Sequence, residues 1–372
     1  MTAGAGSAGL GGGGDASRLL GPWLLALMAA ELLVLFTGSA AAEAAGALLV
    51  IGVPIVGWRR LRLREGYLLG LCGLLLALAL AYDPDPWGLA LRGLDRAGFL
   101  AAFILLMGLL REGGITSPAV LTCGTYVTQQ PPQWRFLAVF LGSHFFSVLI
   151  NLGSLSLLAP IIQRGVRGDS LKREELDEIA LVRERRQLTA LLRGFAWFLV
   201  WAPTAVTQAV LPTLVPGVDT GRLLATGLGL ALLMLLVSWA EDALRWWPLR
   251  RRLRSTGRLP QRLRLPFPGA ALLRLGAVSA LLFGLSLLFA LWGGVLLVAG
   301  VMLAAPVVLL VWVFFQQPAS RPAATLRRLG EVVLHGLPSF HREAVALAAA
   351  GFIGTVAAAL VPAAAVAEAL SV

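Results

Sequence analysis

Long apolar runs alternate along this chain with short clusters that are rich in arginine. The longest runs cover residues 22–36, 67–82, 136–162, 223–240, 270–289 and 292–315. A helix needs about 20 apolar residues to cross the hydrocarbon core of a bilayer, which is roughly 30 Å thick. By that measure the pattern predicts an all-α, polytopic integral membrane protein with about nine or ten membrane elements.

The charged residues are too few for a soluble domain. Only 14% of the 372 residues are charged and 58% are hydrophobic, whereas about a quarter of a soluble domain is charged. The net charge of +11 comes from arginines in the loops between the apolar runs, where anionic headgroups and the positive-inside rule account for them. We therefore expect the lipid bilayer, and not nucleic acid, as a partner.

The many arginines stand beside a single lysine, Lys172. That bias is typical of a GC-rich bacterial genome, so we expect a multi-pass protein of the bacterial cell inner membrane. The arginines of residues 59–64 follow the second apolar run and mark a cytoplasmic loop. Two crossings precede that loop, so the N-terminus is predicted to be cytoplasmic as well.

Composition divides the chain into four predicted parts. Residues 1–18 are rich in glycine and alanine and predict a disordered tail. Residues 19–162 form a first membrane half, residues 163–193 a charged cytoplasmic helix or linker, and residues 194–372 a second membrane half.

The first half contains a problem of parity. If Arg111 and residue 163 both face the cytoplasm, the chain between them crosses the membrane an even number of times, but only the run 136–162 has full length. Either residues 115–128 also cross, or residues 136–162 form a re-entrant hairpin that turns back. Irregular backbone is tolerated in a membrane only where protein or a cavity satisfies it, and such elements occur at the substrate sites of transporters.

A polar stripe within this run is the main candidate site. It contains Ser143, His144, Ser147, Asn151 and Ser154, and the last four follow a three-four-three spacing that places them on one face of a helix. Polar groups facing lipid are costly, so the stripe is expected to face protein or a water-filled cavity. The alternative is a contact between helices, since small and hydroxyl residues join membrane helices to one another.

Two further segments supply candidate residues for binding a solute or an ion. Ser117 follows two glycines, 113 and 114, and precedes a proline, which suits a re-entrant tip or a helix N-terminus that favours an anion; the alternative is an ordinary capped loop. Thr204 follows Pro203 in an apolar run, which predicts a break or a plain kink. Residues 351–355 predict a similar interruption with less polarity.

The remaining titratable residues predict no metal site and no cofactor. Cys72 and Cys123 lack a paired spacing, and no His/Cys/Asp cluster or nucleotide-binding loop is present in the sequence. Glu31 lies within an apolar run, either as a buried carboxylate suited to proton coupling or at the interface. His335 and His341 stand beside arginines and are expected to be solvated.

Short segments of the chain resemble the ion-transporter group of secondary carriers, which includes divalent-anion/sodium symporters. The resemblance rests on Asn-Leu-Gly-Ser at residues 151–154, Pro-Thr at 203–204 and Gly-Thr at 354–355. It implies two structural repeats, each with a re-entrant hairpin and a broken helix that together hold the substrate.

These observations predict a secondary transporter, and not an enzyme, that moves a small solute, an anion by preference, coupled to protons or sodium. One alternative is a membrane-embedded enzyme for a lipid-linked substrate, for which Arg111, Glu112 and His144 would supply charge and acid-base chemistry. Another is a structural subunit of a larger complex. A homo-oligomer is compatible with each of these hypotheses.

Overall fold

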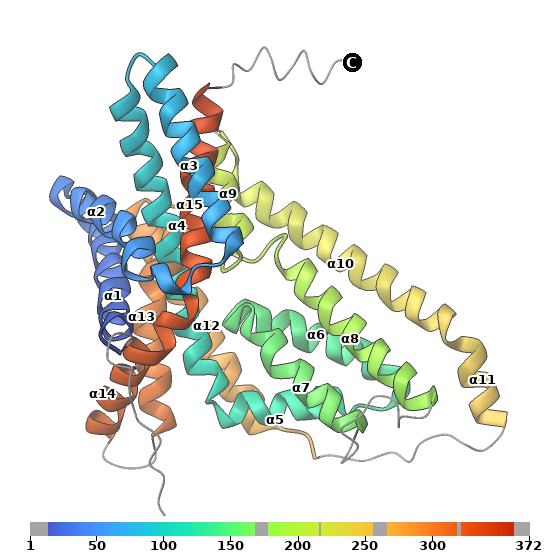
Figure 1. The fold of residues 1–372 in the computed structure, drawn as a ribbon. Helices are drawn as coiled ribbons and strands as arrows, with labels where there is room; N and C mark the ends of the chain where they lie inside the picture. Colours follow the sequence, from blue (N-terminus) through green and yellow to red (C-terminus); the bar gives the residue numbers. More distant parts are fainter. Residues whose placement is uncertain (1–13, 168–177, 216, 256–265, 318–320, 361–372) are drawn as a thin grey trace, which may run out of the picture. The chain divides into compact units, whose positions relative to one another are not determined.

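The computed structural model describes residues 14–167, 178–215, 217–255, 266–317 and 321–360. Every regular element in these ranges is helical (Figure 1). Most of the predicted disordered tail lies outside the described residues, which begin at residue 14. α1 also begins there, at Gly14. The all-α fold class is confirmed.

Eight segments in the described ranges are long and apolar enough to cross a membrane. They comprise most of α1 (Gly14–Thr37), then α3 (Leu63–Tyr82), α4 (Pro86–Ile115), α6 (Pro132–Ile150), α10 (Thr220–Arg245), α12 (Gly269–Gly293) and α13 (Leu297–Gln316), and finally the segment Pro322–Leu360, which includes most of α14 (Arg321–Glu331) and all of α15 (His341–Leu360). The chain therefore forms a multi-pass membrane protein.

Shorter helices join or interrupt these segments. They are α2 (Ala40–Val56), α5 (Pro118–Thr128), α7 (Gly153–Arg167), α9 (Val206–Leu214) and α11 (Trp247–Ser255), with short 3-10 or π-helical turns at Trp58–Arg60, Val332–Gly336 and Leu337–Phe340. The 21-residue α8 (Glu178–Phe198) is longer but is not one of the apolar segments. The apolar α2 has only 17 residues, which gives a length of about 26 Å at 1.5 Å per residue.

The chain forms two compact units, which are described separately. Unit 1 contains the residues up to Leu109 and those from Gln317 onward, and unit 2 contains residues 110–316. The predicted division into membrane halves at residues 162 and 194 rests on composition, and it stays a prediction.

Unit 1 joins the two ends of the chain. α1 packs against α2, and α3 packs against α15. The Arg60 guanidinium donates a hydrogen bond to the Pro338 carbonyl (3.2 Å), and His341 Nε2 donates to the Val53 carbonyl (3.0 Å). His341 is only 1% exposed, so the expectation of a solvated His341 was wrong, whereas His335 is exposed.

Helices of unit 1 approach one another at glycines. A Cβ atom on Gly46 of α2 or on Gly98 of α4 would collide with the carboxylate of Glu31. The Glu31 side chain is therefore buried against α2 and α4. Gly351 lies against the Arg96 carbonyl, where a Cβ would be 2.9 Å from the oxygen. The predicted interruption at residues 351–355 was wrong, because α15 runs through them unbroken. Its glycine permits close packing on α4 and does not end the helix.

The helices of unit 2 bear on the question of parity in the first half. α5 has 11 residues and spans about 16 Å, roughly half of the hydrocarbon core. The long run 136–162 breaks between α6 and α7, which pack against each other. The choice between a second crossing and a re-entrant hairpin stays a prediction.

The charged segment 163–193 is only partly described. α7 extends to Arg167 and α8 begins at Glu178, so the intervening residues lie outside the described ranges. α8 is amphipathic, and it packs against α6 and α7. Its Glu184 and Gln187 side chains are buried, and burial also lowers the pKa of the Arg183 guanidinium from its usual value.

The contact between α12 and α13 supplies a test of the fold. The two helices are joined by a turn in which Gly294 adopts a left-handed conformation (φ 59°). Gly300 of α13 lies directly on the Ser286 carbonyl of α12. We expect Gly300→Ala to cost about 1–3 kcal/mol, because the added methyl group forces the helices apart, and to lower the unfolding temperature measured by a thermal shift assay in detergent.

Gly284→Ala is the matched control for this substitution. Gly284 lies on α12, the helix that Gly300 contacts, and its Cβ would meet no atom within 4 Å. We expect this change to leave the unfolding temperature unchanged or higher, since alanine favours the helix over glycine. Equal losses in the two variants would contradict the close α12–α13 contact.

Candidate functional site

Two helix breaks lie next to each other in unit 2. The first break, residues 151–152, separates α6 from α7, and the second break, residues 199–205, separates α8 from α9. The Asn151 side-chain amide donates a hydrogen bond to the Thr204 carbonyl across the two breaks (Nδ2–O 3.1 Å). The structure therefore brings together two segments that are 53 positions apart in the sequence.

Asn151 has an unusual backbone conformation. Its φ of 47° and ψ of −128° lie in a region that residues with a side chain rarely adopt. Among the described residues it is the only one besides glycine with a positive φ. Such conformations cost about 1–3 kcal/mol and occur at functional sites, where the surrounding structure imposes them.

A chain of hydroxyl groups links the first break to α8. Ser147 Oγ donates to the Ser143 carbonyl (2.6 Å) and also contacts Ser154 Oγ (2.7 Å). Because a hydroxyl group has one proton, Ser154 is the donor in the second bond. Ser143 Oγ in turn donates to the Leu191 carbonyl (2.7 Å). These three predicted site residues therefore connect helices within the protein.

His144 is held by hydrogen bonds at both ring nitrogens. The Trp201 indole N–H donates to Nε2 (2.7 Å), so Nε2 is an acceptor and the proton lies on Nδ1, which contacts the Gly194 carbonyl (3.1 Å). The imidazole is also stacked on Trp201, with ring centroids 5.7 Å apart. Because Nε2 accepts a hydrogen bond, the His144 ring is neutral. Its contacts with Trp201 position the second break.

Thr204 carries the polar atom of this site that has no partner. The residue is 1% exposed, and its hydroxyl oxygen makes no hydrogen bond within the described part of the chain. Nearby, the Gln208 side chain donates to the Val200 carbonyl (3.0 Å) and so satisfies one backbone group of the second break. A buried hydroxyl without a partner costs free energy, which makes Thr204 available for a ligand.

The site is electropositive. α7 and α9 both begin two residues after the residues joined by the Asn151–Thr204 bond. The Ser154 amide of α7 donates to the Asn151 carbonyl, and the Gln208 amide of α9 donates to the Ala205 carbonyl, so these helix starts act on the site through their positive dipole ends. The Arg111 side chain lies against Gly153, where a Cβ would be 2.7 Å from its Cγ. Two helix N-termini and a nearby guanidinium favour an anion.

Ser117 is not joined to the other six predicted residues by the described hydrogen bonds. It precedes α5 at the N-cap position, where its amide donates to the Gly114 carbonyl (3.0 Å) and its side chain forms no cap. The structure therefore brings together Ser143, His144, Ser147, Asn151, Ser154 and Thr204. Ser117 is buried in the same unit.

Some polar residues in unit 2 carry little signal in the sequence. Gln187 is 1% exposed, and neither polar atom of its side chain has a partner in the described residues. Gln187 lies one helical turn before Leu191, so the two residues share the face of α8 that packs on α6. This spacing could have indicated that Gln187 is buried. The Trp201 indole donates to His144, and the Gln208 side chain donates to the Val200 carbonyl; spacing alone does not predict either contact.

Two arginines of α8 are paired with acidic residues of α10. Arg186 forms two hydrogen bonds with the Asp242 carboxylate (2.9 and 2.5 Å), and Arg193 contacts Glu241 at 2.6 Å. These ion pairs join α8 to α10. In the described ranges, no group of three His, Cys, Asp or Glu side chains is placed to hold a metal ion.

Comparisons with protein-family models, with curated proteins and with solved structures find no match to this chain. The chemistry of the two breaks therefore carries the functional argument alone.

The hydroxyl chain generates a prediction about stability. Ser147→Ala removes the donor to the Ser143 carbonyl and the acceptor for Ser154, so we expect a loss of about 1–2 kcal/mol, measured as a lower unfolding temperature in detergent. Ser156→Ala is the control, since its hydroxyl bonds only to the Gly153 carbonyl within its own helix. A change of equal size in both variants would show that the chain of hydroxyls does not hold the helices.

Proposed function

We propose that this protein is a secondary transporter of a small anion and that the anion binds between the first and second breaks. The observation that carries the proposal is the meeting of two broken helices at the Asn151–Thr204 bond, beside a buried hydroxyl that lacks a partner. In secondary transporters, helix N-termini at such breaks point toward anionic groups of the substrate. Coupling to protons or sodium belongs to this proposal.

The mechanism follows from the residues at the breaks. The positive dipole ends of α7 and α9 would attract the anion, and the Thr204 hydroxyl would donate a hydrogen bond to it. Arg111 would contribute long-range positive charge, since its side chain lies against the start of α7. Access would alternate between the two sides of the membrane as the elements around the breaks move. The resemblance to ion-transporter carriers, through residues 151–154 and 203–204, supports the same assignment.

Flux measurements in proteoliposomes test the proposal. Purified protein is reconstituted, and uptake of mono- and dicarboxylates, sulfate, phosphate and chloride is followed with an inward gradient of protons or of sodium. We expect uptake of one anion class that depends on one of the two gradients. If well-inserted protein moves none of these anions under either gradient, the transporter hypothesis is wrong, and the enzyme or subunit alternatives take its place.

Thr204→Val gives a sharper test because it removes the hydroxyl and keeps the shape. A hydrogen bond to a charged group contributes about 1.5–3 kcal/mol, so we expect apparent affinity for the anion to fall about tenfold or more. Stability should not fall, since the lost hydroxyl has no partner in the described protein.

Thr325→Val is the matched control for Thr204→Val. Thr325 belongs to unit 1 and is also buried, with a hydroxyl that has no partner among the described residues. We expect its anion uptake to equal that of the wild type. Equal uptake by the Thr204 variant as well would exclude this hydroxyl from the site.

Asn151→Gly separates the side chain of Asn151 from its backbone. Glycine adopts a positive φ without strain, so the helix break is retained while the bond to the Thr204 carbonyl is lost. We expect maximal uptake to fall strongly because the two breaks are no longer held together. Asn151→Ala removes the same bond but also disfavours the backbone conformation, so it should lower the unfolding temperature more than Asn151→Gly does.

A further inference from the structure

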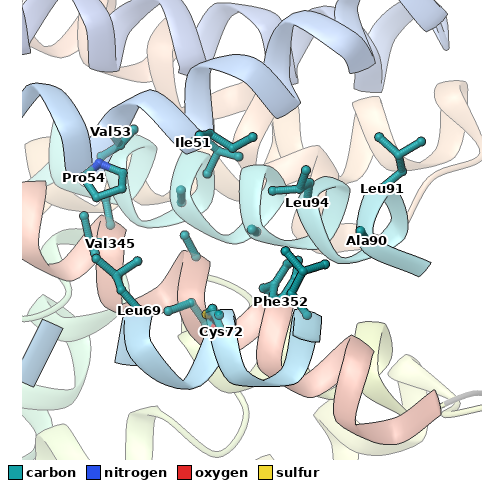
Figure 2. Close-up of a pocket in the computed structure, with 18 of the residues that line it drawn as sticks. Ile51, Val53, Pro54, Leu69, Cys72, Ala90, Leu91, Leu94, Val345 and Phe352 are labelled. Carbon is teal, nitrogen blue, oxygen red and sulfur yellow. Dashed lines mark hydrogen bonds between the residues drawn. The ribbon is translucent and has the colours of Figure 1, made fainter. Parts of the chain in front are cut away.

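Unit 1 contains an apolar groove that the proposed transport site does not use. Its volume is about 500 Å³, and it lies among α2, α3, α4 and α15. Figure 2 shows side chains of all four helices pointing into the same space, among them Ile51, Cys72, Leu94 and Phe352.

The chemistry of the groove excludes a polar ligand. Apart from the Cys72 thiol and the Trp87 indole, every side chain among the described lining residues is hydrocarbon. Several of them are open to the surroundings: Trp87 is 68% exposed and Leu91 61%. Water has too few polar partners in such a space, whereas a lipid chain from the surrounding bilayer meets an apolar wall on all sides.

The length of the groove matches one acyl chain. Its wall on α4 runs from Trp87 to Ala101, which corresponds to about 21 Å at a rise of 1.5 Å per residue. One leaflet contributes about half of a hydrocarbon core that is roughly 30 Å thick. A chain lying along α4 would therefore be covered over the depth of one leaflet.

One end of the groove is strongly basic. Pro54, near the end of α2, and Leu69, in the second turn of α3, line this end. The loop between these helices presents the exposed side chains of Arg59 and Arg62, and the start of α3 presents Arg64, which is exposed and pairs with Glu65 (2.8 Å). Basic side chains at a membrane surface attract anionic headgroups.

Aromatic residues place this loop at the depth of lipid headgroups. Trp58 is 63% exposed and Tyr67 is 72% exposed, and they stand on either side of the arginines. Trp and Tyr are enriched where the hydrocarbon core meets the headgroups. The arginines therefore lie where a phosphate would be when the chain of the same lipid fills the groove.

We propose that unit 1 binds one anionic phospholipid, with an acyl chain in the groove and the phosphate on the arginines of residues 59–64. The charge at the mouth and the apolar lining together select this occupant over a zwitterionic lipid. The inference concerns unit 1 alone, so its failure would leave the proposed anion site in unit 2 untouched.

Photocrosslinking in lipid nanodiscs tests this binding. The full-length protein is reconstituted with a phosphatidylglycerol that carries a diazirine in its acyl chain, irradiated, digested and mapped by mass spectrometry. A phosphatidylcholine with the same chain serves as the second probe. We expect phosphatidylglycerol to label peptides of α3, α4 and α15 that line the groove, and phosphatidylcholine to label them much less.

Gly73→Leu places a side chain in the groove without a clash, since a Cβ at Gly73 meets no atom within 4 Å. We expect it to abolish labelling of the groove. Gly70→Leu is the matched control: a Cβ there also meets open space, and Gly70 does not line the groove. This variant should be labelled like the wild type. Size-exclusion chromatography establishes that both variants are folded.

The headgroup contact is tested with the double variant Arg59→Gln/Arg62→Gln, which spares Arg60 and its bond to Pro338. Each arginine near an anionic surface contributes about fivefold in affinity, so the preference for phosphatidylglycerol should disappear in this variant.

Equal labelling of the groove by both lipids in the wild type would overturn the proposal, because the groove would then hold any bilayer lipid. Absence of labelling at the groove, or labelling that Gly73→Leu leaves unchanged, would overturn it as well.

Discussion

A membrane offers no water to backbone groups that a helix leaves unpaired, and the organisation of unit 2 depends on this constraint. α6 and α8 both end within apolar sequence, and each break frees amides and carbonyls that must find partners. The Asn151 amide satisfies the Thr204 carbonyl, and the Gln208 amide satisfies the Val200 carbonyl. Once two breaks share their partners in this way, neither can close into a continuous helix without exposing the other.

Much of the architecture could be predicted from the sequence, because hydrophobic length is a one-dimensional property. The boundary of α1 at Thr37, that of α3 at Tyr82 and the turn at Gly294 follow from apolar runs and the residues that end them. The polar stripe from His144 to Ser154 also indicated a feature of importance, since polar side chains in such a run require protein partners. The prediction of a single helical face was wrong, because α6 ends at Ile150 and Ser154 belongs to α7, from which it reaches Ser147 by a hydrogen bond.

Other features depend on distances between segments and could not be predicted. Because Gly351 is a glycine, the sequence predicted a helix break there. In the structure the residue lies close to the Arg96 carbonyl, and the lack of a side chain permits this contact. His341 follows an interfacial stretch in sequence, yet it is buried against the Val53 carbonyl. Likewise, the bond from Asn151 to Thr204 connects residues whose separation along the chain shows no periodicity. The periodicity of the sequence describes one helix at a time, whereas these contacts join residues of two different segments.

The composition of unit 1 from both ends of the chain has a consequence for biosynthesis. The Arg60–Pro338 and His341–Val53 bonds span 278 and 288 positions, so they form only after the ribosome has synthesised the chain beyond residue 341. Until then α1 to α3 reside in the bilayer without α15, the helix on which α3 packs. Lipids and the insertion machinery must shield those early helices throughout translation, and a chain truncated before residue 317 would leave them without their final partner.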